Sequence, residues 1–187
     1  MVEENNRKVL VVMTGGTIDF VWDEELMGMV PAEHSAIPGY FVHLSRNSNF
    51  PENLTFKEVC MKDSRDLTSE DRKNILDTVE RADTTNIIIT HGIYTMPTTA
   101  KYLKLNLKRK DQTIILTGAT TPLKGFSSPV DASFNLGFAM VQALNLSAGI
   151  YICINARVFT AKKVDLNIFQ SSQPQAILLD TQKLSNV

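Results

Sequence analysis

The sequence predicts a doubly wound α/β fold, in which helices cover both faces of a mostly parallel sheet to give three layers. Four short runs rich in Val and Ile have the length of strands, and helix-like segments lie between them: 8–14, 86–91, 113–118 and 149–155. These runs are apolar at nearly every position, as expected of strands buried on both faces of a parallel sheet. A chain of 187 residues that is 43% hydrophobic can bury a large core. We therefore expect one domain spanning residues 1–187.

Three segments have the pattern of helices: 68–83, 96–107 and 131–146. The first opens with Thr68 as an N-cap and has Asp71 three residues later, which is the spacing of a capping box. The second carries Pro97 near its first turn, where the missing N–H costs little. The third places Phe134 and Phe138 at helical spacing, and we expect these rings to point into the core.

Two segments look irregular. Residues 20–53 are rich in Gly, Pro, Asn and Ser, which indicates a long loop with at most one short helix. Loops of this length in compact domains often act as lids. Beyond residue 156 we expect a further loop, followed by a loose tail over about 170–187.

Charge and cysteine content narrow the classes of partner. A formal net charge of -1 gives no long-range attraction to nucleic acid or to an anionic membrane, and a small ligand fits better. Cys60 and Cys153 each lie in an apolar run and are expected to be free thiols, with no metal site. No apolar run approaches a membrane span, and the polar N-terminus does not resemble a secretory signal. These features predict a cytoplasmic protein.

The end of the first predicted strand, "TGGTI", is a candidate catalytic turn. In open α/β sheets, ligands bind at the carboxyl ends of the strands. Gly15 and Gly16 let the backbone turn sharply and approach a ligand closely, leaving Thr17 as a candidate nucleophile. A strand-to-loop turn capped by Thr17 explains the same letters equally well. A nucleophilic hydroxyl would also need a neighbouring base.

Other strand ends offer polar groups with two interpretations each. Asp63 could accept a hydrogen bond from a substrate ammonium and Ser64 could hold a carboxylate, or the pair could form an Asx-turn and a cap. His91 could be a base, or it could be hydrogen-bonded to nearby backbone. Lys162 and Lys163 could lower the pKa of a nearby hydroxyl, or they could face solvent.

Six segments in the same order resemble the bacterial-type L-asparaginase family, and especially its short, single-domain members. They are "TGGTI", "KDS", "ITHG" followed by "TM", "ILTGA", "VDASFNLGFA" and "GIYICINARVF". The matching region runs from Val9 to about Asn167. The resemblance implies a mostly parallel α/β domain that hydrolyses a side-chain amide to the acid and ammonia. It implies no metal and no organic cofactor.

The resemblance also assigns roles to matching residues. It implies that Thr17 is the nucleophile and forms an acyl-enzyme. Asp63 and Ser64 take the substrate-binding place, with Ser64 suited to the α-carboxylate. The backbone at Ala119 approaches the amide end of the substrate. The turn that presents the nucleophile is built by Thr14, Gly15 and Gly16.

The loop that follows the second predicted strand departs from the family pattern. The family has "HGTDTM", whereas this chain places Ile93 and Tyr94 after Gly92. Ile93 has no hydroxyl, and a tyrosine with its ordinary pKa of about 10 supplies no carboxylate at neutral pH. The family's lysine corresponds to Lys163 in one register and to Leu166 in another.

We therefore predict an asparaginase-like amidohydrolase with reduced or altered activity. Its predicted catalytic residues are Thr17, Tyr94 and Lys163, and an acidic side chain from residues 20–30 is a further candidate base. The predicted substrate-binding residues are Thr14, Gly16, Asp63, Ser64, Gly92, Ile93 and Ala119. The alternative is a catalytically inactive domain that binds a small carboxylate ligand or a protein partner. The resemblance further implies a homo-oligomer, most simply a dimer.

Overall fold

The structure, a computed structural model, describes residues 8–47, 53–125 and 130–161. Its centre is a six-stranded sheet in the order β4-β1-β5-β6-β7-β8. The first five strands in that order are parallel and β8 pairs with β7 in the antiparallel sense. The strands are β1 (Val9–Gly15), β4 (Leu54–Lys62), β5 (Asn86–Thr90), β6 (Thr113–Thr117), β7 (Gly149–Ile154) and β8 (Arg157–Thr160).

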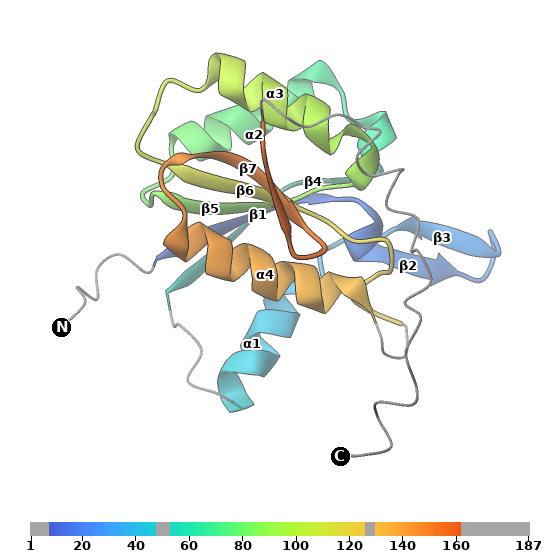
Figure 1. The fold of residues 1–187 in the computed structure, drawn as a ribbon. Helices are drawn as coiled ribbons and strands as arrows, with labels where there is room; N and C mark the ends of the chain where they lie inside the picture. Colours follow the sequence, from blue (N-terminus) through green and yellow to red (C-terminus); the bar gives the residue numbers. More distant parts are fainter. Residues whose placement is uncertain (1–7, 48–52, 126–129, 162–187) are drawn as a thin grey trace, which may run out of the picture.

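Helices cover both faces of this sheet (Figure 1). One face is covered by α2 (Ser69–Glu80) and α3 (Met96–Asn106), and the other by α1 (Ile37–Asn47) and α4 (Asp131–Asn145). Alternate residues of a strand point to opposite faces, so Val11 packs in the core with α1 and α4, while Val12 packs in the core with α2 and α3. The predicted three-layer, mostly parallel α/β fold is confirmed.

The predicted start of α2 is also confirmed. Thr68 Oγ1 accepts a hydrogen bond from the Asp71 N–H at 3.1 Å, and Asp71 Oδ2 accepts one from the Thr68 N–H at 2.8 Å. This is a reciprocal capping box, which satisfies two backbone donors that the helix itself cannot use. Pro97 lies in the first turn of α3, as expected.

The prediction for the phenylalanines of α4 is wrong for Phe134. Its side chain is 56% exposed, and it stacks on Phe138, which is partly buried, with ring centroids 6.5 Å apart. The buried face of α4 is formed by smaller residues, with Ala132, Ala139 and Ala143 alongside Leu136. These alanines leave little bulk between helix and sheet, and the Phe134 ring takes the outer side of the helix.

Residues 20–47 are more regular than the loop predicted over residues 20–53. They contain a hairpin of β2 (Phe20–Asp23) and β3 (Gly28–Pro31) and the 11-residue helix α1. In Figure 1 the hairpin extends away from the body of the domain. Its turn includes Met27, whose φ of 47° explains how a short connection reverses the chain.

The loop predicted after residue 156 is also partly wrong. Asn155 and Ala156 both have positive φ, the conformation that two-residue hairpin turns require, and they lead directly into β8. The predicted tail over 170–187 lies outside the described residues.

Candidate active site

Three glycines bring together the loops that follow β1, β4 and β5. A Cβ on Gly16 would lie 2.5 Å from Gly92 Cα, and one on Gly15 would lie 2.5 Å from Lys62 N. A Cβ on Gly92 would lie 2.6 Å from Ser64 Oγ. Gly15 and Gly16 also have φ of 82° and 83°, which other residues rarely adopt. The three strand ends therefore meet in close contact, between backbone atoms at Gly15 and Gly16 and with the Ser64 side chain at Gly92.

Thr17 begins the 3₁₀ turn Thr17–Asp19 at this junction and is half-buried. The turn is fixed from both sides, because Gly16 N donates to the Lys62 carbonyl and Asp19 N donates to the Gly16 carbonyl, both at 2.9 Å. Within the described residues, Thr17 Oγ1 takes part in no hydrogen bond. Its hydroxyl is held on a rigid turn, without a base from those residues attached to it.

Two other predicted substrate-binding residues serve the framework. Thr14 Oγ1 donates to the Thr90 carbonyl at 2.7 Å and so ties the end of β1 to the end of β5. Ile93 is half-buried and packs against the core under α2 and α3. Thr14 and Ile93 lie close in the chain to Gly16 and Gly92, respectively. The contacts described for both side chains are with other residues of the protein.

Ser64 joins the second and third loops. Its side chain is buried, its carbonyl accepts a hydrogen bond from Thr95 Oγ1 at 2.6 Å, and its Oγ accepts one from Thr95 N at 3.4 Å. A serine hydroxyl can donate one hydrogen bond in addition to those it accepts. The Ser64 hydroxyl can therefore donate one further hydrogen bond.

Asp63 forms an ion pair with Arg65. Asp63 Oδ1 accepts from Arg65 N at 2.8 Å and from Arg65 Nε at 3.0 Å, and Oδ2 accepts from a terminal guanidinium nitrogen at 2.7 Å. These side-chain bonds hold the pKa of Asp63 below its usual value, against the opposing effect of partial burial. The structure thus shows the Asx-turn interpretation of Asp63.

Tyr94 lies under the same arginine. The Arg65 guanidinium carbon is 5.0 Å from the centroid of the Tyr94 ring, within the range of a cation–π contact, and Tyr94 is 59% exposed. Sequence reasoning singled out Asp63 and Tyr94 separately and missed the residue that connects them. The available signal was an arginine two residues after an aspartate, a spacing at which an Asx-turn can fold back onto its own carboxylate.

His91 is buried and serves the framework. Nδ1 lies 2.7 Å from the Gly92 carbonyl, which can only accept, so Nδ1 carries the proton and Nε2 accepts from Thr99 Oγ1 at 2.8 Å. Arg72 Nε in turn donates to Thr99 Oγ1 at 3.3 Å. Burial is the main cause that lowers the pKa of His91 to about 4, and the positive charge of Arg72 acts in the same direction. A neutral, fully bonded imidazole confirms the backbone-bonded interpretation.

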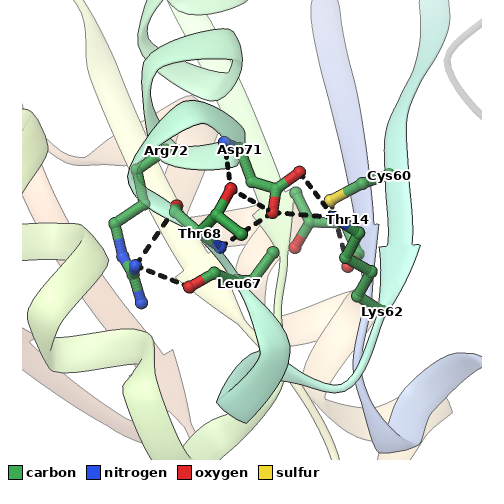
Figure 2. Close-up of polar contacts among 7 residues, drawn as sticks. All are labelled: Thr14, Cys60, Lys62, Leu67, Thr68, Asp71 and Arg72. Atoms are coloured by element: carbon green, nitrogen blue, oxygen red, sulfur yellow. Dashed lines mark hydrogen bonds and ion pairs between the residues drawn. The ribbon is translucent and has the colours of Figure 1, made fainter.

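A polar network supports the loop after β4 from the side of α2 (Figure 2). Lys62 Nζ bonds both carboxylate oxygens of Asp71 at 2.9 Å, and Asp71 also accepts from the Thr68 hydroxyl at 2.8 Å. Burial pushes the pKa of Asp71 upward, but the bonds from Lys62 and Thr68 outweigh it and keep the pKa low. Because the Lys62 carbonyl holds Gly16, this network anchors the turn that carries Thr17 to α2. Cys60 Sγ lies 3.7 Å from the Thr14 carbonyl in the same region.

Ala119 lies on the loop after β6, which also reaches the junction. Ala119 is buried, and a Cβ on its neighbour Gly118 would overlap the His91 carbonyl. Asn135 of α4 fixes this loop, because its Nδ2 donates to the Gly118 carbonyl at 2.9 Å and its Oδ1 accepts from Asn155 N at 2.8 Å. Sequence reasoning missed Asn135, which it treated as part of an apolar helix.

Asp19 is a second residue that sequence reasoning missed. It ends the turn that begins with Thr17 and is only 3% exposed. Oδ1 accepts from the Ser35 hydroxyl at 2.8 Å and from Ala36 N at 3.1 Å, whereas Oδ2 has no partner among the described residues. Burial raises the pKa of Asp19 to about 6, against the lowering effect of those two bonds.

Lys163, which the sequence predicted as a catalytic residue, lies outside the described residues.

Comparison with known proteins identifies the family. The family model described as "Asparaginase, N-terminal" matches residues 8–177. The chain belongs to the asparaginase family. This asparaginase-family domain is 25% identical over 167 residues to a glutaminase-asparaginase of Acinetobacter glutaminasificans, covering 86% of the domain and 50% of that protein. It is 29% identical over 150 residues to L-asparaginase 1 of Escherichia coli K12, covering 74% of the domain and 41% of that protein.

Solved structures support the fold of this asparaginase-family domain. A thermostable L-asparaginase from Thermococcus kodakarensis aligns with a TM-score of 0.68 at 24% identity, over 86% of the domain and 49% of that chain. A probable cytoplasmic L-asparaginase from Campylobacter jejuni aligns with a TM-score of 0.70 at 22% identity, over 84% and 49%. The domain thus spans about half the length of the relatives it matches. Within residues 8–47, 53–125 and 130–161, no helix has the length and apolar character of a membrane span.

Proposed function

We propose that this domain hydrolyses a small amide through an acyl-enzyme on Thr17. Thr17 Oγ1 attacks the carbonyl carbon, the carbon–nitrogen bond breaks, and nitrogen leaves as ammonia with the proton that the hydroxyl gave up. Water then attacks the ester, releasing the acid and restoring the hydroxyl. The proposal is carried by one observation: the glycine contacts hold the turn that begins with Thr17 beside the loops of Ser64 and Gly92.

Turnover of asparagine should be slow. A positioned acid or base typically contributes on the order of 10² to 10⁴ in rate. Within the described residues, Thr17 Oγ1 is bonded to no such group. Tyr94, Lys163 and the acidic side chains of residues 20–30 remain the candidate bases. Asp19 joins them because it ends the turn that Thr17 begins and its Oδ2 has no partner among the described residues, while burial raises its pKa to about 6.

Ammonia release tests the proposal. The purified domain would be assayed with asparagine, glutamine and other small amides beside Thr17→Ala and Thr17→Ser. We expect release that Thr17→Ala abolishes and that Thr17→Ser partly keeps, since serine retains the hydroxyl. Activity that survives Thr17→Ala would rule out Thr17 as the nucleophile.

A gain of function tests the loop after β5. Restoring Ile93→Thr and Tyr94→Asp together should raise asparagine hydrolysis if these two positions limit the rate. No gain, in a variant that folds with the wild-type circular dichroism spectrum, would place the limitation elsewhere, for example at Lys163 or Leu166.

A second candidate function is binding without catalysis. It is favoured by the unbonded Thr17 hydroxyl and by the pairing of Asp63 with Arg65, since both leave the reactive set incomplete within the described residues. Calorimetric titration with aspartate and asparagine separates the two functions. Saturable binding with no ammonia release from any amide would favour this candidate, whereas release that depends on Thr17 would exclude it.

The remaining proposals concern the assembly and its location. We propose a homodimer in the cytoplasm that acts on a small molecule, needs no metal or organic cofactor, and binds neither nucleic acid nor membrane. One structural neighbour is described as a probable cytoplasmic L-asparaginase. Light scattering of the purified domain checks the dimer, and a monomer at micromolar concentration would contradict it.

A further inference from the structure

The arrangement of Asp63, Arg65 and Tyr94 bears on which substrate the site accepts. Arg65 follows Ser64 in the chain, and Tyr94 follows Gly92 by two residues, so both flank the junction at which Gly16, Gly92 and Ser64 meet. The two loops are locked together by the Thr95 bonds to Ser64 and by the Arg65 guanidinium over the Tyr94 ring. Arg65 is thus held beside this junction.

Neither Asp63 nor Tyr94 offers a free carboxylate to a substrate ammonium. Both oxygens of Asp63 are bonded by Arg65, and its side chain is 15% exposed, so an incoming ammonium would have to displace a bidentate pair. Tyr94 stands where the family pattern has an aspartate, and its side chain carries no carboxylate. Asp66 is exposed, and its charge also acts on Arg65. An ion pair between a substrate ammonium and this carboxylate would be weak, because exposed ion pairs are weak in water.

A carboxylate would be received much better. A guanidinium has five N–H donors, and Arg65 uses one on Nε and one on a terminal nitrogen to hold Asp63. Its side chain is 65% exposed, so the remaining donors can reach a ligand. The Ser64 hydroxyl keeps a proton to donate at the neighbouring position. The two side chains together offer hydrogen-bond donors and a positive charge to an anionic group.

We propose that the site selects carboxylates that carry no free amine, so that its amide substrate is the monoamide of a simple dicarboxylic acid, of which succinamic acid is the smallest fitting example. Arg65 and Ser64 receive the carboxylate, and the amide end is presented to Thr17. Hydrolysis then gives the dicarboxylate and ammonia. This substrate class rests on the proposed amide hydrolysis, but the preference for ligands without an amine is a property of binding alone.

Binding of the two acid products tests the preference. Succinate and aspartate have the same two carboxylates and differ in the amine, so calorimetric titration of each into the full chain isolates the amine. We expect succinate to bind on the order of tenfold or more tightly than aspartate, since the ammonium of aspartate would lie beside the Arg65 guanidinium while the Asp63 carboxylate is already paired. Equal affinities, tighter binding of aspartate, or no binding of succinate at 10 mM would each overturn the proposal.

Charge variants assign the effect to Arg65. Arg65→Gln should lower the affinity for succinate on the order of tenfold. The matched control is Arg109→Gln, because Arg109 makes the same forked pair with an aspartate two residues away, through Nε at 3.1 Å and a terminal nitrogen at 2.7 Å. Arg109 precedes β6, so it lies toward the opposite end of the sheet from the junction. Equal losses in both variants would show a general effect of net charge and overturn the assignment.

Turnover separates this inference from the proposed function. Ammonia release from succinamate should exceed release from asparagine, and Thr17→Ala should abolish it. Faster release from asparagine would overturn the inference and leave the amidohydrolase intact. Absence of release from every amide, with succinate still preferred over aspartate in calorimetry, would overturn amide hydrolysis and leave the ligand preference standing.

Discussion

Two buried ionisable groups near the candidate nucleophile should make the free energy of unfolding depend on pH in opposite directions. Burial lowers the pKa of His91 from 6.5 to about 4. Burial also raises the pKa of Asp19 from 3.8 to about 6, against its bonds with Ser35 and Ala36. Each shift is a difference in proton affinity between the folded and unfolded chains, so each makes the free energy of unfolding depend on pH.

The two groups act with opposite sign. As pH falls through 6.5 the unfolded chain protonates His91 while the folded chain does not, so the contribution of this residue is complete above pH 6.5 and is lost on acidification. Linkage makes that loss about 2 kcal/mol between pH 7.5 and pH 5.0. Asp19 is protonated first in the folded chain, near pH 6. The cost of burying its carboxylate is therefore relieved on acidification, by about 1 kcal/mol over the same window.

Urea unfolding at pH 7.5 and 5.0 measures both terms in the wild type, His91→Asn and Asp19→Asn. Asparagine keeps a donor for the Gly92 carbonyl at one site and an acceptor for Ser35 at the other, and it does not titrate. Asp19→Asn should lose about 1 kcal/mol more stability than the wild type on acidification, and His91→Asn about 2 kcal/mol less. Surface groups titrate in all three proteins and cancel in the comparison.

The reasoning is refuted if either variant follows the pH profile of the wild type. An unchanged profile for His91→Asn would mean that His91 titrates near its ordinary pKa in the folded chain, and it would then return as a candidate base. An unchanged profile for Asp19→Asn would mean that its carboxylate is hydrated or paired in solution.

Three further predictions concern the junction of the loops and the thiols. Gly92→Ala should lower the free energy of unfolding by about 1 to 3 kcal/mol, because its Cβ would lie 2.6 Å from Ser64 Oγ. Adding Ser64→Gly should restore part of this loss. Strictly additive effects of the two substitutions in urea unfolding would contradict the contact. Thr95→Val should cost about 1 kcal/mol by removing the 2.6 Å bond to the Ser64 carbonyl, which an unchanged unfolding midpoint would disprove. Cys60 and Cys153 should react slowly with a thiol reagent at pH 8, because burial raises their pKa values to about 11 and 12, and rapid labelling of the folded chain would argue against this.

Local chemistry made several elements predictable. The runs that became β1, β5, β6 and β7 are apolar on both faces, a pattern typical of a covered parallel sheet. Thr68 and Asp71 form the capping box that their spacing indicates, because its hydrogen bonds span only three residues. The hairpin and helix within residues 20–53 were harder to predict, since Gly, Pro and Asn also suit loops.

The outward position of Phe134 was set by packing. The helix α4 is apolar on more than one side, so its spacing alone allows either face to be buried. Contact with the sheet selected the alanine side, which permits closer approach.

By itself, the sequence determined the layered α/β fold, the glycine turn that carries Thr17, and the replacement of two polar residues by Ile93 and Tyr94. The first two follow from short residue patterns and their physical chemistry, whereas the replacement at residues 93 and 94 follows from the resemblance to the family. Only the tertiary structure decided that the Arg65 guanidinium lies over the Tyr94 ring, that burial lowers the pKa of His91, and that Asp19 is buried at the end of the turn that carries Thr17. A shifted pKa and a contact between a guanidinium and a ring depend on which groups from distant parts of the chain come together, and those contacts exist only after folding.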